Sequence, residues 1–282
     1  MRTAIYLILF IFISYSEILA QRSNKSAVEK LSKSVFEETT LTGLKFRSIG
    51  PAQTSGRVSD FAINPNNFKE YYVAAASGGV WKTVNAGTTY IPVFDEAGSY
   101  SIGCITMDPN NANVIWVGTG ENNNQRSVPY GDGVYKSIDG GETWKNMGLK
   151  SSEHIGKILV DPNNSNIIYV AAIGPLWSSG GERGVYKSVN GGETWRLMLG
   201  IDADTGINDL IMDPRDSQVI YAAAYQRRRH VFTYLGGGPS SGLHKSVDGG
   251  TTWVDINKGL PEVDMGRIGM AMAPSDPEVI YA

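Results

Sequence analysis

An eight-residue motif recurs four times in this chain and constrains its fold more than any other feature. The copies are TVNAGTTY from Thr83, SIDGGETW from Ser137, SVNGGETW from Ser188 and SVDGGTTW from Ser246, which places them 54, 51 and 58 residues apart. Each copy follows a short β-prone run that contains a lysine, such as GVWK or GVYK. Repeats of this length indicate an array of similar supersecondary units.

A second motif repeats in step with this octet. It reads INPNNFKEYYVA from Ile63, MDPNNANVIWVG from Met107, VDPNNSNIIYVA from Val160 and MDPRDSQVIYAA from Met212, and a fifth copy begins at Met272. Each unit divides into four short β-prone runs separated by turn residues, without a helical period. Such four-stranded units are typical of β-propeller blades, and a β-sandwich is the competing all-β interpretation.

The repeats predict a propeller over residues 44–282. Four complete blades are expected at about 51–100, 101–153, 154–205 and 206–264, with part of a fifth at 265–282. Because the sequence stops inside the second strand of the fifth unit, we expect an N-terminal fragment whose remaining blades lie in a longer chain. The run LKFRSIG from Leu44 resembles an outer strand and is predicted to close the ring, which would remove an exposed sheet edge.

The first twenty residues predict a secretory signal peptide, with a basic start, the apolar run AIYLILFIFISY and cleavage before Gln21. The apolar run is too short to span a bilayer comfortably, although an uncleaved anchor is the alternative. A polar segment follows at 21–43 and contains a possible short helix. Cys104 is the only cysteine, so an internal disulfide is excluded and this thiol is expected to be buried. The expected location is secreted, periplasmic or at the cell surface.

The residue types of the octet suit a tight turn. Its glycines permit positive φ angles, its Asp or Asn accepts hydrogen bonds from nearby backbone amides, and its Trp offers a large apolar face. Because every unit carries the same set, we interpret the octet as structural and not catalytic. The residues with this structural role are Asn85, Asp139, Trp144, Asn190, Trp195, Asp248 and Trp253.

The octet pattern, S-x-[DN]-x-G-x-[ST]-W, is similar to the Asp-box, also called the bacterial neuraminidase repeat, and the resemblance covers residues 44–282. In sialidases, tandem-propeller xyloglucanases and sortilin-type receptors the box is a fold element away from the ligand, and the resemblance implies the same here. The blades, as in GVYKSIDGGETW, most resemble the sortilin-type or glycosyl-hydrolase-like exported propellers of bacteria.

Two hydrolase signatures differ in this sequence. Sialidases carry an Arg-Ile-Pro motif near the start of the domain, whereas this chain has FRSIGP from Phe46. Xyloglucanases place a catalytic Asp just before the Gly-Gly of TDIGG, whereas the matching AAASGGVW has Ala76 or Ser77 there. The cysteine-rich module of sortilin receptors also has no counterpart in this sequence.

The loops between the second and third strands are expected to carry function. In an up-and-down blade they lie at the end opposite the octets, and they vary in length from SGG to YQRRRHVFTYLGGGPSSG. Aromatic and polar side chains in these loops suit a peptide, protein or glycan ligand, and His154 is expected beside them at the channel mouth. The candidate ligand-binding residues are Arg57, Glu121, Arg126, Tyr130, Trp177, Arg183, His230 and Arg267.

Several function classes are disfavoured. The net charge is −3, and the one basic block, residues 227–229, is interpreted as a solvated loop tip, so nucleic acid is not an expected partner. The three histidines have no metal-ligand spacing, and the sequence has no P-loop, dinucleotide fingerprint or nucleophile elbow. We therefore predict no cofactor and no metal.

Catalysis is left open at this stage. Cleavage of a glycosidic bond needs two carboxylates that flank it, and the sequence does not pair the loop acids Glu121, Asp132 and Glu182. The main hypothesis is therefore an exported propeller that binds a peptide, protein or glycan without catalysis. A glycoside hydrolase acting on a polysaccharide is the alternative, and an assembly or purely structural module is the third.

Overall fold

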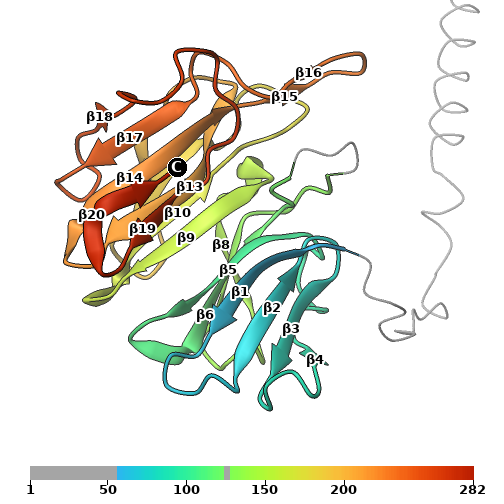
Figure 1. Cartoon of the computed structure of the whole chain (residues 1–282). Helices are drawn as coiled ribbons and strands as arrows, with labels where there is room; N and C mark the ends of the chain where they lie inside the picture. Colours follow the sequence, from blue (N-terminus) through green and yellow to red (C-terminus); the bar gives the residue numbers. More distant parts are fainter. Residues whose placement is uncertain (1–55, 124–127) are drawn as a thin grey trace, which may run out of the picture. The chain divides into compact units, whose positions relative to one another are not determined.

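The computed structural model describes residues 56–123 and 128–282, which belong to the second of two compact units, Met1–Ala52 and Gln53–Ala282 (Figure 1). The predicted signal peptide, the polar segment 21–43, the strand from Leu44 and Arg126 lie outside the described residues. No helix in the described part is long and apolar enough to cross a membrane.

Four sheets of four antiparallel strands follow one another along the chain. The first holds β1 (Val58–Ile63), β2 (Tyr71–Ala75), β3 (Gly79–Thr83) and β4 (Ile91–Pro92). The second holds β5 (Ile102–Asp108), β6 (Asn111–Thr119), β7 (Val134–Ser137) and β8 (Lys145–Gly148). The third holds β9 (Ile155–Asp161), β10 (Asn164–Ala172), β11 (Gly184–Ser188) and β12 (Arg196–Leu199). The fourth holds β13 (Thr205–Asp213), β14 (Asp216–Gln226), β17 (Gly242–Ser246) and β18 (Val254–Asp255).

Two smaller strand pairs complete the described part. A projecting hairpin joins β15 (Arg228–Arg229) to β16 (Tyr234–Leu235), and a two-stranded sheet holds β19 (Ala271–Ala273) and β20 (Asp276–Tyr281). Within residues 56–123 and 128–282 the only helix is a short 3-10 turn, η1 (Lys150–Ser152).

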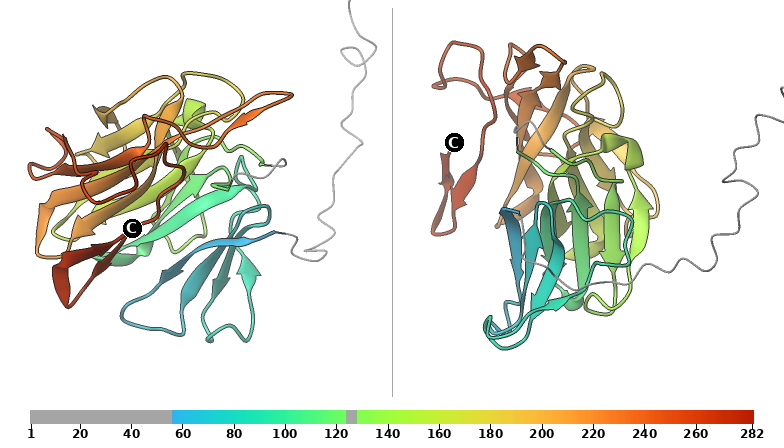
Figure 2. Two further views of the ribbon diagram at one scale, coloured as in Figure 1. Left: turned by 45° about the horizontal axis from the view of Figure 1, so that its top comes forward. Right: turned by 90° about the vertical axis from the view of Figure 1, so that its right-hand side faces the viewer.

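The sheets are arranged as the blades of a propeller. Their first strands lie side by side in the order β1, β5, β9, β13 and β19, and Figure 2 shows this succession from two further sides. The predicted all-β fold of four-stranded antiparallel units is thereby confirmed, and it is a propeller, not a sandwich. The number of blades in the complete ring stays a prediction.

Apolar clusters fill the spaces between successive blades. Between the first and second sheets, Tyr72 and Val80 pack with Ile102 and Ile105, and all four are buried. Two further clusters repeat this arrangement between the second and third and between the third and fourth sheets. Cys104 belongs to the second cluster and is buried, as predicted. Burial of these faces supplies the main stabilisation of a fold without disulfides.

Each octet folds into a closed turn. In the second blade the Ser137 hydroxyl donates to Asp139 Oδ1 over 2.7 Å and accepts the Gly141 N–H over 2.8 Å. Asp139 in turn accepts the backbone N–H of Thr143 over 2.9 Å. Hydrogen bonds from Thr143, side chain first and then backbone, lower the pKa of Asp139 to about 2. The side chains of the octet therefore satisfy the backbone of its own turn.

The octets also join neighbouring blades. Lys136 of the second blade donates from Nζ to the Gly191 carbonyl of the third octet over 3.1 Å. In the opposite direction, Trp195 of that octet donates from Nε1 to the Met147 carbonyl of the second blade over 2.7 Å. The same octet thus closes a turn and fixes its blade to the preceding one.

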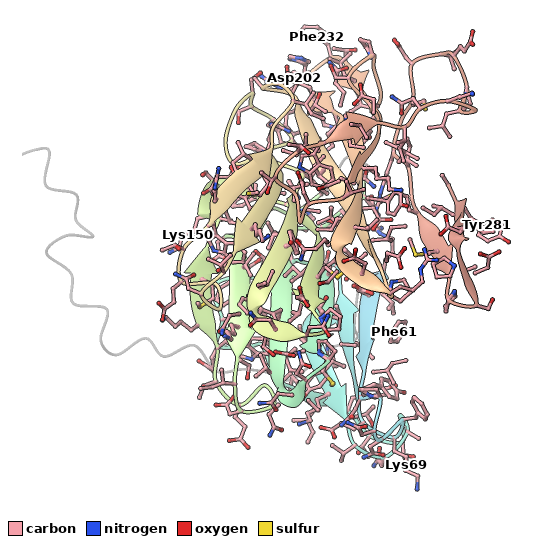
Figure 3. The ribbon with its side chains drawn as sticks, turned by 90° about the vertical axis from the view of Figure 1, so that its left-hand side faces the viewer. Phe61, Lys69, Lys150, Asp202, Phe232 and Tyr281 are labelled. Atoms are coloured by element: carbon pink, nitrogen blue, oxygen red, sulfur yellow. The ribbon has the colours of Figure 1, made fainter. Side chains whose placement is uncertain are left out.

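The blades have two different ends. Octet backbone N–H groups donate to carbonyls near the start of the second strand of the same blade, as from Gly140 to Asn113 over 2.8 Å. The octets and the turns between first and second strands therefore lie at the same end, which we call the octet end. The loops after the second strands lie at the other end, which we call the loop end. In Figure 3, Phe232 and Asp202 mark the loop end and Lys69 marks the octet end.

Candidate functional site

The loop end carries the irregular segments of the molecule. The loops between second and third strands span 76–78, 120–133, 173–183 and 227–241 in the four successive blades. These segments differ in length and composition, whereas the turns at the octet end are alike. We therefore expect ligand-binding residues at the loop end, where the loops vary, and not at the octet end.

Glu121 lies at the centre of the first group of predicted residues. It follows β6 and is 1% exposed, and its Oε1 forms an ion pair with a guanidinium nitrogen of Arg57. The Nδ1 atom of His154 lies 2.9 Å from the Glu121 carbonyl oxygen. The second carboxylate oxygen, Oε2, has no hydrogen-bond partner among the described residues. A buried carboxylate with an unused oxygen has capacity for a ligand or a proton.

A glycine makes this position of Glu121 possible. Gly120 has φ of 88°, a conformation that side chains rarely adopt, and a Cβ there would overlap the Glu153 carbonyl oxygen. The next residue, Asn122, donates from Nδ2 to the Gly103 carbonyl over 2.8 Å and to the Gly156 carbonyl over 3.2 Å. The chain after β6 thus lies against the third blade.

Arg267 joins the same group from the fifth unit, because its Nη1 donates to the Asn122 carbonyl over 3.1 Å. The structure therefore brings together predicted residues from four different blades. We call this set the mouth cluster, and it consists of Arg57, Glu121, Asn122, His154 and Arg267.

An aromatic platform lies on the loops of the third and fourth blades. Trp177 is 53% exposed, and the guanidinium of Arg229 lies 5.9 Å from its ring centre. The same guanidinium lies 4.7 Å from the ring centre of Tyr234, whose hydroxyl is 2.8 Å from that of Tyr225. We call Trp177, Arg229 and Tyr234 the loop platform. Stacked aromatic and guanidinium groups of this kind present a broad, partly apolar surface.

The remaining predicted residues behave differently. Arg183 is 5% exposed and donates to the carbonyls of Ile173, Gly180 and Ser178 over 2.8–2.9 Å, and also to that of Pro175. These bonds hold its own loop, so its role as a ligand-binding residue stays a prediction.

Two other predicted residues are not counted in the mouth cluster. His230 stacks on Phe232 near the tip of the β15–β16 hairpin. Tyr130 is 73% exposed on the loop of the second blade, next to Pro129, whose carbonyl accepts the Glu121 N–H over 3.1 Å. The part of His230 and Tyr130 in ligand binding stays a prediction.

Sequence reasoning missed Glu153. Its backbone has φ of 62°, which is unusual for a residue with a side chain, and burial raises the pKa of its carboxyl while Arg183 and Arg227 oppose this rise. Next to it, burial and the same two arginines hold the pKa of His154 well below its usual value. At neutral pH this histidine is therefore uncharged. A carboxyl with a raised pKa is suited to proton transfer.

The basic block was also interpreted wrongly. The sequence suggested a solvated tip at residues 227–229, but Arg227 is 0% exposed. Arg228 pairs with Asp204 over 3.0 Å, and Arg229 belongs to the loop platform. After β14 the chain continues across the third blade, where the Arg229 N–H donates to the Leu176 carbonyl over 2.8 Å. This contact holds the three arginine side chains inward.

Charged residues also line the inner strands. Lys157 lies 3.6 Å from Asp60, and Asp60 accepts the Ile105 N–H over 3.2 Å. Asp209 accepts the Met270 N–H over 2.8 Å in the same manner. These carboxylates connect neighbouring first strands, which is a structural use of the acids.

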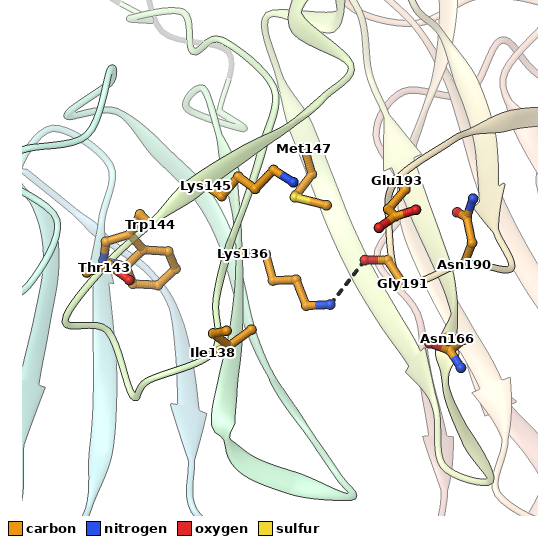
Figure 4. Close-up of a pocket in the computed structure, with 10 residues that line it drawn as sticks. All are labelled: Lys136, Ile138, Thr143, Trp144, Lys145, Met147, Asn166, Asn190, Gly191 and Glu193. Carbon is orange, nitrogen blue, oxygen red and sulfur yellow. Dashed lines mark hydrogen bonds between the residues drawn. The ribbon is translucent and has the colours of Figure 1, made fainter.

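A pocket of about 440 Å³ lies at the octet end, between the second and third blades (Figure 4). Trp144 and Met147 line it on one side and Asn190 and Glu193 on the other. Its Lys136–Gly191 hydrogen bond is the interblade contact described above. Among the described residues, no group of three or more His, Cys, Asp or Glu side chains is placed to hold a metal ion.

The comparisons with known proteins agree on the type of fold. No family model matches the chain. A xyloglucanase from Paenibacillus is 23% identical over 264 residues, covering 83% of this chain and 24% of the enzyme. A xyloglucanase from Hypocrea jecorina is 28% identical over 176 residues, covering 57% of this chain and 20% of the enzyme. The chain thus spans about a quarter of these relatives.

Solved structures give a similar picture. An ancestral GH74 enzyme and the GH74 enzyme of Niastella koreensis each match with a TM-score of 0.58 and 22% identity. The matches cover 78% and 79% of this chain, and 28% and 33% of those structures. This likeness establishes the propeller fold. The xyloglucanase relatives agree better with the glycoside hydrolase alternative than with the sortilin-type interpretation.

Proposed function

We propose that this chain is part of a glycoside hydrolase-like propeller that acts on a polysaccharide at its loop end. The observation that carries the proposal is that the exposed loop platform and the carboxyls of Glu121 and Glu153 lie at the same end of the blades. An exposed tryptophan offers a flat face to a sugar ring, and carboxyls at the same end can supply acid and base.

Two carboxyls have complementary properties for such a reaction. Glu153 is suited to the general acid because burial raises its pKa. Glu121 is suited to the carboxylate that acts as base or nucleophile, because it is paired with Arg57 and its Oε2 has no hydrogen-bond partner among the described residues. Glycoside cleavage requires two carboxyl groups that flank the scissile bond, one as general acid and the other as base or nucleophile. The predicted export of the chain fits a polysaccharide outside the cell.

A second candidate function is polysaccharide binding without cleavage. It is favoured by Ala76 and Ser77, which occupy the place where the xyloglucanase resemblance implies a catalytic carboxylate, and Ala76 is 2% exposed. In this case the loop end would bind the polymer, and the acids would be structural.

The test is the release of reducing ends from a polysaccharide panel that begins with xyloglucan, with binding measured separately by affinity electrophoresis. The variants are Glu153→Gln and Glu121→Gln, and Glu142→Gln is the control because this glutamate is exposed in an octet turn at the other end of the blades. Loss of release in the first two variants, with binding retained, supports the hydrolase. Binding without release by the wild-type chain selects the second candidate, and the absence of both refutes the proposal.

A further inference from the structure

Arg227 carries an uncompensated charge beneath the loop end. It follows directly on β14 and is fully buried, and its backbone N–H donates to the Asp204 carbonyl over 3.0 Å. All three guanidinium nitrogens lack a hydrogen-bond partner among the described residues. A buried cation that has lost its water and gained no partner is strongly unfavourable, and native structures seldom keep one without a use.

Arg227 forms no ion pair among the described residues, and neither does Arg183. The groups that interact with Arg227 electrostatically are the hydroxyls of Tyr225 and Tyr234, the neutral His154, the carboxyl of Glu153 and two further arginines, Arg183 and Arg267. Burial, with the repulsion of the two arginines, lowers the pKa of Arg227 to about 10, so it stays protonated at neutral pH.

The hairpin next to Arg227 is short. Tyr234, which interacts with Arg227 electrostatically, lies on β16, and β16 pairs with β15 at only two positions, Arg228↔Leu235 and Arg229↔Tyr234. Beyond these strands the hairpin tip exposes Val231 and Phe232 almost completely. Short pairings with little burial open at low free-energy cost. We therefore expect a ligand group to approach the guanidinium through opening of this hairpin.

We propose that the loop end recognises an acidic polysaccharide, and that Arg227 donates hydrogen bonds to the carboxylate of a uronic acid unit bound at the loop platform. This inference rests on the proposed function and deepens it, because it names the chemical class of the polymer. A guanidinium matches a carboxylate with two parallel hydrogen bonds, and the pair is strong where water is excluded. Arg183 and Arg267 add positive potential at the same place.

The test uses affinity electrophoresis with polygalacturonate and alginate, each beside its carboxyl-reduced form. Arg227→Met removes the charge and keeps an unbranched apolar side chain of similar reach. Arg196→Met is the matched control, because Arg196 is exposed on β12 and the net charge changes equally. Thermal unfolding reports on folding, and Arg227→Met is expected to raise the melting temperature because an unpaired buried charge is replaced by an apolar group.

We expect the wild-type chain to prefer an acidic polymer over its reduced form, and Arg227→Met to lower that affinity by about tenfold or more. Arg227→Lys, which keeps the charge but not the planar fork, should give an intermediate loss. Equal binding of acidic and reduced polymers, or unchanged binding by Arg227→Met, overturns the inference and leaves the proposed function standing. The absence of binding and cleavage on every polymer, xyloglucan included, refutes both.

Discussion

Replacing Asp139 and Asp248 by asparagine is expected to make the fold less sensitive to acid without disturbing it at neutral pH. Hydrogen bonds from the following threonine, Thr143 or Thr252, hold the pKa of each carboxyl at about 2. The third octet already contains an amide at this position. Asn190 accepts the Thr194 N–H over 3.0 Å and donates to its hydroxyl over 2.9 Å, so the turn accommodates asparagine.

The size of the effect follows from proton binding. A depressed pKa in the folded state stabilises the protein fully above the unfolded value of 3.8, and this stabilisation is lost as the pH falls towards 2. At about pH 3 an unfolded aspartate binds about 0.9 proton and a folded octet aspartate about 0.1. Unfolding of the wild-type chain should therefore take up about 1.5 more protons than unfolding of the double variant.

Urea unfolding followed by tryptophan fluorescence at several pH values between 2 and 7 measures this difference, because the slope of the unfolding free energy against pH gives the proton uptake. Asp264→Asn is the control, since this aspartate is exposed on a loop. A wild-type slope below pH 4 in the double variant would refute the stabilising role of the two carboxylates. A loss of stability in the double variant at pH 7 would show that the carboxylates have a role that asparagine does not fill.

Two substitutions and one labelling experiment test the assignment of roles. Ser188→Ala should lower the free energy of unfolding by about 1–3 kcal/mol, because the buried N–H of Gly192 loses its acceptor, whereas Ser178→Ala on an exposed loop should leave the urea midpoint unchanged. Trp177→Ala should weaken polysaccharide binding by about tenfold or more with an unchanged melting temperature, as judged by affinity electrophoresis and thermal unfolding. Cys104, fully buried and with a raised thiol pKa, should react with a thiol reagent only after unfolding, so fast labelling of the native chain would contradict its burial.

The fold was predictable because its information is local and repeated. Every octet brings its own turn chemistry, as Ser137 and Asp139 illustrate, and every second motif brings a β-prone strand. Repetition in register then selects a propeller from among the all-β folds. The same logic correctly assigned Cys104 to the core, because an apolar run surrounds it.

The site was only partly predictable because its information is not local. Glu121 and Arg57 were expected at one end, but their pairing depends on how the first and second blades pack. Glu153 has no motif, and only its backbone conformation and burial distinguish it. Arg227 was misread because a run of three arginines normally indicates solvent. It follows a strand in which residues 220–225 are all buried, so its burial depends on how the loop after β14 packs, which the sequence does not show.

The lysine before each octet offers a final test, in which the chain supplies its own control. Lys136 lies 4.8 Å from the Trp116 ring centre and also bonds the Gly191 carbonyl of the next octet. Lys245 lies 5.1 Å from the Tyr221 ring centre, but no octet carbonyl accepts from it within the described residues. Lys136→Met should therefore lower the unfolding free energy by about 1–2 kcal/mol, and Lys245→Met should change it by less than about 0.5 kcal/mol. Equal losses in urea unfolding would mean that the cation–ring contact, and not the interblade hydrogen bond, is the stabilising interaction.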